Sequence, residues 1–193
     1  MKFAWIVTAV VLAFPVAAPA QVTTNGKTYP ATVSVEGKDL KLVGAGLRKK
    51  FGIAKVYTMG VYTEAGACDA GQVIATDEVK YLKLDFLRSV SAEKFRDTMQ
   101  ESFEKHTPAG ASEELKNQGA LFVSSLTEDL TEGAIVELTY VPGKGTTAKV
   151  KGKQVGSAYA GRGFQKWLWD IYFGPKTCCE GLKDDVFESC GKK

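Results

Sequence analysis

Residues 42–64 read LVGAGLRKKFGIAKVYTMGVYTE, and they contain the clearest pattern in the chain. A Gly-Ala-Gly turn, Gly44 to Gly46, leads to the basic cluster Arg48-Lys49-Lys50. From Phe51 to Thr63, bulky residues occupy alternate positions and small residues lie between them. This period of two predicts one long strand whose two faces have different surroundings. The small face should lie against a close neighbour, either a packed helix or a bound ligand.

Arg48 is the candidate binding residue of this segment. Its guanidinium group presents five donors in a rigid plane, which suits a carboxylate or an enolate-like oxygen. The alternative interpretation is an ordinary surface arginine. The residue type of Arg48 and its place beside the glycines therefore make it a candidate for binding an anion.

The first 20 residues have the pattern of a secretory signal peptide. Lys2 is followed by an apolar run that ends in Ala18-Pro19-Ala20. Two prolines interrupt the run, whereas a membrane anchor needs about 20 apolar residues. We therefore expect cleavage after Ala20 and a periplasmic or secreted protein, with no membrane span in the mature chain.

Residues 21–193 suffice for one domain with a full hydrophobic core and leave little room for a second. The formal net charge of the whole chain is +3, and basic residues are mixed with acidic ones. This surplus is too small to indicate a nucleic acid partner. Composition thus favours a single globular domain that binds something other than nucleic acid.

Four cysteines in an exported chain indicate disulfides. They are Cys68, Cys178, Cys179 and Cys190. The adjacent pair is not expected to bond to itself. We favour a bridge from Cys190 to Cys178 or Cys179, because a short helix between them could bring the ends of that loop together. Two separated Cys-x-x-Cys pairs are missing and His106 lies far away in sequence, so we expect no metal.

The rest of the chain predicts strands and helices in separate blocks. Alternation predicts a hairpin at 29–43 and strands at 82–86, 134–141, 146–151 and 154–158. Apolar spacing and capping residues predict helices at 92–106, 112–126, 161–173 and about 177–187. Residues 21–27 and 66–71 are expected to be a frayed lead-in and a loop. The pattern indicates an α+β domain, an antiparallel sheet with helices gathered on one face.

The usual catalytic motifs are missing from the sequence. It contains no Gly-x-Ser-x-Gly, no phosphate-binding glycine loop and no His-Glu-x-x-His. With a single histidine, a Ser-His or Cys-His nucleophile pair is not expected. We also expect no cofactor.

Three motifs resemble the N-terminal signature of the chalcone isomerase family. They are Tyr29-Pro30-Ala31-Thr32-Val33, Gly44-Ala45-Gly46-Leu47-Arg48 and Val56-Tyr57-Thr58-Met59-Gly60-Val61-Tyr62. The likeness continues in outline through Ser91-Ala92-Glu93-Lys94-Phe95 and Tyr172-Phe173-Gly174, and it is greater to the exported bacterial branch than to the plant enzymes. The resemblance implies an open-faced β-sandwich, a large antiparallel sheet backed by helices, with an apolar cleft between them.

The resemblance also implies a set of site residues. In the plant enzymes the cleft holds an arginine, a threonine, a tyrosine, an asparagine and a late serine or threonine. By alignment these positions fall on Arg48, Tyr57, Phe95, Ser102 and Gln165, so that one of the five is clearly retained. With their neighbours, the candidate ligand-binding residues are Arg48, Tyr57, Thr58, Phe95, Met99, Ser102, Gln165 and Trp167.

Three functions are consistent with these features. The first is a non-catalytic periplasmic binder of a small apolar carboxylate such as a fatty acid, because other branches of the family are similar to fatty-acid binders that retain the arginine. The second is an intramolecular lyase acting on a chalcone-like, phenolic or enone substrate, with Arg48 and Tyr57 as catalytic residues. The third is an envelope interaction protein whose cleft is vestigial and filled by side chains.

Overall fold

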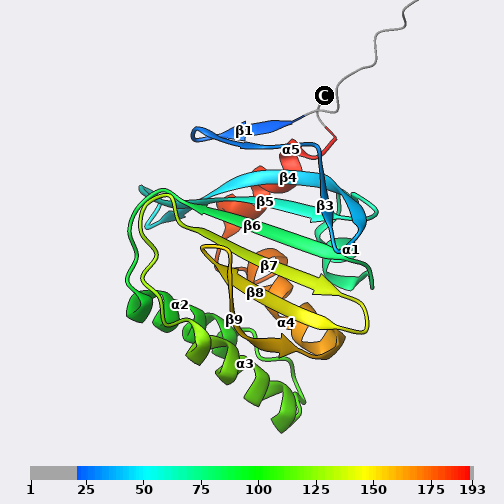
Figure 1. Cartoon of the computed structure of the whole chain (residues 1–193), viewed down its shortest axis with the longest axis vertical. Coiled ribbons are helices and arrows are strands. Elements are labelled where there is room, and N and C mark those ends of the chain that lie inside the picture. Colours follow the sequence, from blue (N-terminus) through cyan, green and yellow to red (C-terminus); the bar gives the residue numbers. More distant parts are fainter. Residues whose placement is uncertain (1–20, 192–193) are drawn as a thin grey trace, which may run out of the picture.

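Seven antiparallel strands form a curled sheet in this computed structural model, which describes residues 21–191 (Figure 1). The strands lie in sequence order, and each pairs with the next. Their bounds are β3 Thr32–Val35, β4 Lys38–Lys50, β5 Ala54–Thr63, β6 Lys80–Phe86, β7 Ile135–Val141, β8 Gly145–Val150 and β9 Lys153–Tyr159. The signal peptide expected at residues 1–20 lies outside the described residues.

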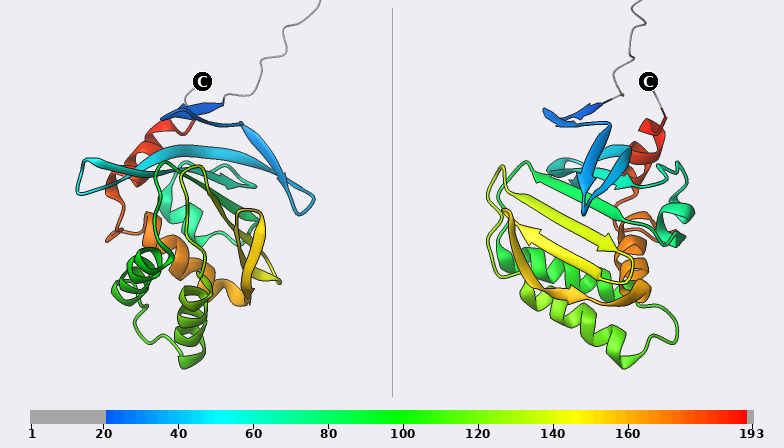
Figure 2. Two further views of the ribbon diagram at one scale, coloured as in Figure 1. Left: turned by 60° about the vertical axis from the view of Figure 1, so that its left-hand side comes forward. Right: turned by 45° about the vertical axis from the view of Figure 1, so that its right-hand side comes forward.

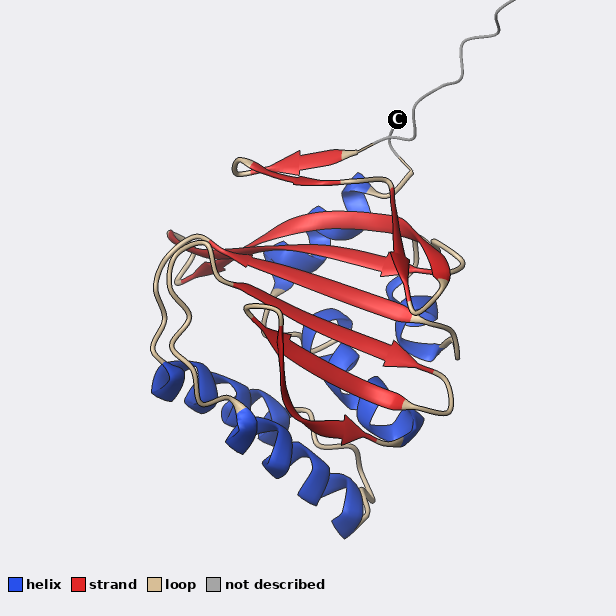
Figure 3. Ribbon diagram, viewed as in Figure 1, coloured by secondary structure: helices blue, strands red, loops and turns tan. Residues whose placement is uncertain are grey.

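The helices lie on one side of this sheet (Figures 2 and 3). Their bounds are α1 Ala70–Ala75, α2 Ala92–Lys105, α3 Glu113–Ser125, α4 Gly161–Phe173 and α5 Glu180–Ser189. This arrangement confirms the predicted α+β class and the open-faced β-sandwich. Within residues 21–191, no helix combines the length and the apolar character needed to cross a membrane.

Local signals explain where the main helices begin. The side chains of Ser91 and Ser112 accept hydrogen bonds from backbone N–H groups three residues later, as N-caps do. Both helix starts were predicted from these serines. The last helix begins at Glu180 without a side-chain cap, although a capping box from Thr177 was expected there.

Two short segments have more structure than the sequence predicted. A hairpin of β1 (Val22–Thr24) and β2 (Lys27–Tyr29) replaces the expected frayed lead-in. Its turn is Asn25-Gly26, with φ of 48° and 77°, the usual choice for a tight hairpin turn. Helix α1 begins inside the expected loop at Ala70, where the side chain of Asp69 caps it by accepting a hydrogen bond from the N–H of Gln72.

The central segment forms two strands joined by a turn. Strand β4 continues to Lys50, the chain turns at Phe51 and Gly52, and β5 begins at Ala54. The turn expected at Gly44 to Gly46 is therefore wrong, because β4 runs through these residues, and the strand expected to start at Phe51 starts three residues later. The expected neighbour of the small face is also different at Gly60. The group that closely approaches Gly60 is the ring of Tyr29, and not a helix or a ligand.

The glycines of β4 allow α5 to pack directly on the sheet. A Cβ at Gly44 would overlap the carbonyl oxygen of Val186 and lie 2.9 Å from its carbon. Beyond Lys41, no described strand pairs with β4 on its outer edge. There the side chain of Asp185 accepts a hydrogen bond from the N–H of Leu47 at 3.0 Å, and Ser189 does the same for Ala45 at 3.2 Å. Helix α5 thereby covers an open sheet edge.

We expect Gly44→Ala to lower the free energy of unfolding by about 1–3 kcal/mol, because the helix backbone must move to admit the methyl group. The matched control is Gly181→Ala within α5, where a Cβ meets no atom within 4 Å. That control should leave the protein as stable or raise its stability by up to about 1 kcal/mol. Urea denaturation measures both. Equal stabilities of the two variants would contradict this packing.

The disulfide pairing differs from the predicted one. Cys68 bonds to Cys190, and Cys178 bonds to Cys179. The favoured bridge from Cys190 to Cys178 or Cys179 is wrong because α5 separates them, and a ten-residue helix holds its ends about 15 Å apart. The bonded cysteines are compatible with an exported protein.

Candidate functional site

A cavity of about 370 Å³ lies between the sheet and α2, at the end of the sheet where β4 turns into β5. Strands β4, β5 and β6 supply one wall and α2 supplies the opposite wall. The C-terminal end of α4 and the Cys178–Cys179 pair complete the lining. The site thus joins residues from four parts of the chain.

The sheet wall is a row of side chains across three neighbouring strands. Arg48 of β4 lies opposite Tyr57 of β5, and Tyr57 lies opposite Phe86 of β6. Directly paired residues project from the same face of a sheet. The rings of Tyr57 and Phe86 are 5.3 Å apart, and Phe95 of α2 meets Phe86 edge-on at 5.9 Å. The row therefore places a guanidinium and a phenol beside an aromatic surface.

The α2 wall consists of side chains from one helix face. They are related by three- and four-residue steps, the spacing of neighbours on a helix surface, and they are Lys94, Phe95, Thr98, Met99 and Ser102. The hydroxyls of Thr98 and Ser102 donate to backbone carbonyls of α2 itself, at 2.9 and 2.7 Å. These hydroxyls are already hydrogen-bonded, so Phe95 and Met99 contribute most of the surface open to an apolar ligand.

Tyr172 lies at the inner end of the cavity. It stands near the end of α4 beside Ile171, and its hydroxyl contacts the sulfur of Met99 at 4.0 Å. Burial raises the pKa of Tyr172 well above its usual value. Burial likewise raises the pKa of Tyr57 to about 12, against the opposing charge of Arg48. Both phenols therefore remain protonated O–H donors at neutral pH.

The charged residues of the cavity are all basic. They are Arg48, Lys50, Arg88 and Lys94, and no aspartate or glutamate of residues 21–191 lines the cavity. Within the described part of the chain, none of the four forms an ion pair. Arg48 donates to the backbone carbonyl of Lys49. A positive potential without an internal counter-charge favours an anionic ligand.

The family of the chain follows from comparison with known proteins. The model of the family described as chalcone isomerase-like matches residues 21–187. The chain belongs to the chalcone isomerase-like family. No curated protein sequence matches it.

The chalcone isomerase-like fold is also seen in a solved structure of similar shape. This is the crystal structure of an Arabidopsis thaliana fatty-acid binding protein, with a TM-score of 0.68 and 18% sequence identity. The match covers 88% of this chain and 96% of the plant protein. At this identity the likeness establishes the shared fold.

Five of the eight candidate residues lie around the cavity of this chalcone isomerase-like protein. They are Arg48, Tyr57, Phe95, Met99 and Ser102. Thr58 does not, because neighbouring strand residues face opposite sides of a sheet and Tyr57 occupies the cavity side. Thr58 instead lies 2.7 Å from the hydroxyl of Tyr29 on the far face.

Gln165 and Trp167 lie elsewhere on α4. The amide of Gln165 donates to the carbonyl of Ile74 in α1 at 3.3 Å, and the indole of Trp167 donates to that of Phe103 at 3.2 Å. Tyr172 lies seven positions after Gln165, which is about 10 Å along the helix axis. The expectation that these two residues line the cavity is therefore not met.

Among the lining residues that sequence reasoning missed are one buried tyrosine and three cations. Tyr172 was assigned to the apolar face of α4, although its hydroxyl and its place just before Gly174-Pro175 distinguish it from its neighbours. Lys50, Arg88 and Lys94 were not among the candidate residues. Lys94 precedes Phe95, so its position on α2 was available from helical spacing. Arg88 had no such signal, because it lies in the connection from β6 to α2.

Proposed function

We propose that this chalcone isomerase-like protein binds a fatty acid, with its carboxylate at Arg48 and its hydrocarbon chain in the cavity. The observation that carries the proposal is a set of four unpaired cations at a cavity whose remaining lining is mostly apolar and includes no acidic residue from the described part of the chain. A carboxylate would supply the missing counter-charge. The apolar remainder of the ligand would cover Phe86, Phe95 and Met99.

Arg48 and Tyr57 suit a carboxylate in both charge and geometry. A guanidinium can donate two parallel hydrogen bonds to the two carboxylate oxygens. The Tyr57 hydroxyl, opposite Arg48 and protonated at neutral pH, adds a donor from the same sheet face. Such charge-assisted bonds are strong where solvent is excluded. Arg48 is therefore the main anchor in this proposal.

The size of the cavity limits the ligand to a single small molecule. Its volume of about 370 Å³ is near the lower end of the range for ligand pockets. An open cavity at Arg48 also disfavours a vestigial cleft filled by side chains. The structural similarity to the Arabidopsis thaliana fatty-acid binding protein supports the ligand class.

The proposed location is the periplasm. The sequence of residues 1–20 supports a signal peptide, and bonded cysteines suit an oxidising compartment. N-terminal sequencing of protein purified from the envelope fraction tests this location. A chain that begins at Gln21 is expected, and an intact Met1 on protein recovered from the cytosol would contradict it.

Mass spectrometry of whatever leaves the native protein on denaturation tests the proposed function. We expect a fatty acid in near-equal molar amount with the protein. Protein recovered without ligand should bind added decanoate in a calorimetric titration, with release of heat and saturation at one site. Absence of both a copurified acid and decanoate binding would overturn the proposal.

We expect Tyr57→Phe to weaken decanoate binding about tenfold. The variant loses one hydrogen bond to a charged group, worth about 1.5 kcal/mol, and keeps the ring. The matched control is Tyr140→Phe, since the Tyr140 hydroxyl donates to Asp77 outside the cavity. Calorimetry should give the control the wild-type affinity. Identical affinities for Tyr57→Phe and Tyr140→Phe would remove Tyr57 from the carboxylate site.

Intramolecular lyase activity is the second candidate, because Arg48 and Tyr57 face one cavity and could together polarise a carbonyl oxygen. The α2 wall is apolar at Phe95, where the plant enzymes carry a hydroxyl. The geometry therefore favours binding. Loss of chalcone absorbance faster than the spontaneous rate would favour the lyase instead.

A further inference from the structure

The turn between β4 and β5 exposes two large apolar side chains. Phe51 is 87% exposed and Ile53 is 85% exposed. Among the described residues, the third exposed large apolar side chain is Leu121 on α3, at 60%. The β4–β5 turn thus carries two almost fully exposed apolar side chains, two residues apart.

The backbone of this turn is unusual for the residue that it carries. Phe51 has a φ of 54° and Gly52 has a φ of 72°, so both lie in the left-handed region. Hairpin turns of this kind favour asparagine followed by glycine, and a bulky residue with positive φ is uncommon. Phenylalanine at this position therefore costs stability, and it buries little surface against the described residues. A contact outside the chain would account for both features.

Basic residues surround the apolar pair. Arg48, Lys49 and Lys50 precede it and Lys55 follows it, while no acidic residue occurs between Asp39 and Glu64. The ammonium group of Lys50 lies 5.4 Å from the centre of the Phe51 ring. All charged residues near the end of this hairpin are therefore basic, and they surround two apolar side chains.

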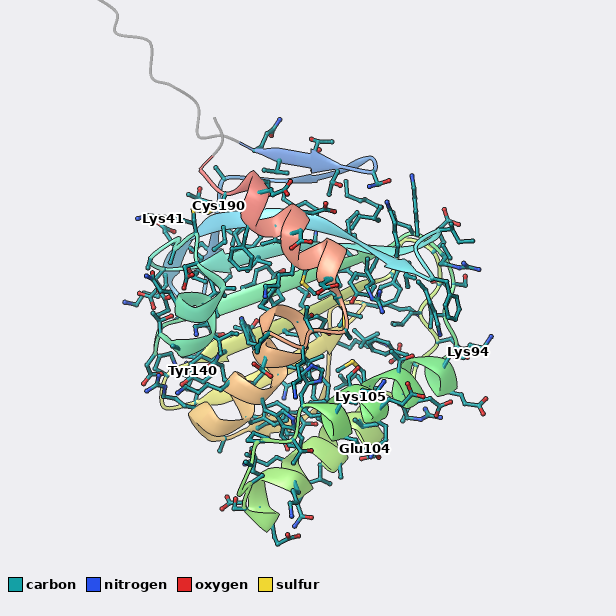
Figure 4. All side chains as sticks on the ribbon, turned by 180° about the vertical axis from the view of Figure 1, so that it is seen from behind. Lys41, Lys94, Glu104, Lys105, Tyr140 and Cys190 are labelled. Atoms are coloured by element: carbon teal, nitrogen blue, oxygen red, sulfur yellow. A yellow bond between two sulfur atoms is a disulfide. The ribbon has the colours of Figure 1, made fainter. Side chains whose placement is uncertain are left out.

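The turn also forms part of the cavity mouth. Phe51 and Ala54 line the cavity together with Arg88 and Lys94. Figures 1 and 4 both place the N-terminal end of α2, with Lys94 labelled in Figure 4, on the side of the molecule where β4 turns into β5. The exposed apolar pair and the entrance of the cavity therefore share one surface.

We propose that this surface docks on an anionic phospholipid bilayer, with Phe51 and Ile53 inserted among the lipids. Cations beside exposed apolar groups are the combination that binds peripheral proteins to acidic lipid surfaces. An acidic protein partner would pair with the basic residues but would not require two exposed apolar side chains. Docking in this orientation turns the cavity mouth toward the bilayer. The proposal extends beyond ligand binding and does not depend on it.

Flotation with lipid vesicles tests the docking. The probe is vesicles of phosphatidylcholine and phosphatidylglycerol without free fatty acid, compared with vesicles of phosphatidylcholine alone. We expect binding to the anionic vesicles and weaker binding at high salt. The double variant Phe51→Ser/Ile53→Ser should lower the partition coefficient about tenfold or more. The control Leu121→Ser removes an exposed apolar side chain elsewhere and should retain wild-type binding.

A fluorescence measurement keeps the test independent of the double variant. Phe51→Trp places an indole at the turn, whereas Trp167 and Trp169 are buried. Its emission should shift to shorter wavelength on addition of anionic vesicles. Absence of vesicle binding, equal loss in Leu121→Ser, or no emission shift would overturn the proposal. So would a dimer in sedimentation analysis that Phe51→Ser/Ile53→Ser abolishes, because a second copy would then occupy the surface.

Discussion

Arg48→Ala should weaken decanoate binding at least about 30-fold, or about 2 kcal/mol, because it leaves the carboxylate without its charged partner. The cavity would keep its apolar walls and three other cations. Calorimetric titration of ligand-free protein measures the change. Arg48→Lys should give an intermediate affinity, since an ammonium keeps the charge but loses the planar pair of donors.

The matched control for this experiment is Lys149→Ala. Lys149 is an exposed cation on β8 and does not line the cavity. Its removal changes the net charge by the same amount as removal of Arg48. The control separates a general charge effect from a local contact. Equal binding by wild type and Arg48→Ala would refute the assigned role of Arg48.

Loss of the Cys68–Cys190 disulfide should lower the free energy of unfolding by about 2–5 kcal/mol. The bond joins residues 122 apart in sequence, so it restricts a long loop of the unfolded chain. It also ties the end of α5 to the loop after β5. We expect Cys68→Ser/Cys190→Ser to unfold at lower urea concentration and to lose α5 to limited proteolysis before the sheet is cleaved.

The adjacent pair provides the control for this prediction. Cys178 and Cys179 are neighbours in sequence, so their bond closes almost no loop of the unfolded chain. Cys178→Ser/Cys179→Ser should therefore lower stability far less than the first double variant. A stability of Cys68→Ser/Cys190→Ser within about 0.5 kcal/mol of wild type would contradict the account.

The sheet and the long helices were predictable because their signals are local. Alternation identified most strands of the large sheet, and Ser91 and Ser112 marked two helix starts. The type of fold then followed from the order of these elements. The turn at Phe51 escaped prediction because strand-like alternation continues through it, and only Gly52 indicated a reversal.

The site was only partly predictable, because a cavity is assembled from distant segments. Arg48 and Tyr57 were accessible from the resemblance to the chalcone isomerase family, and strand geometry could have excluded Thr58. That Tyr172 rather than Gln165 lines the cavity depends on which end of α4 adjoins it. The disulfide pairing required the direction of α5. Neither property is encoded in local spacing.

The most direct test of carboxylate binding by Arg48 is the coupling between the two groups. Decanoate and its methyl ester are titrated into ligand-free wild type and Arg48→Ala, and the four affinities give a double-mutant cycle. We predict that esterification weakens binding to wild type at least about tenfold more than binding to Arg48→Ala. The same loss on esterification in both proteins would show that the carboxylate does not contact Arg48.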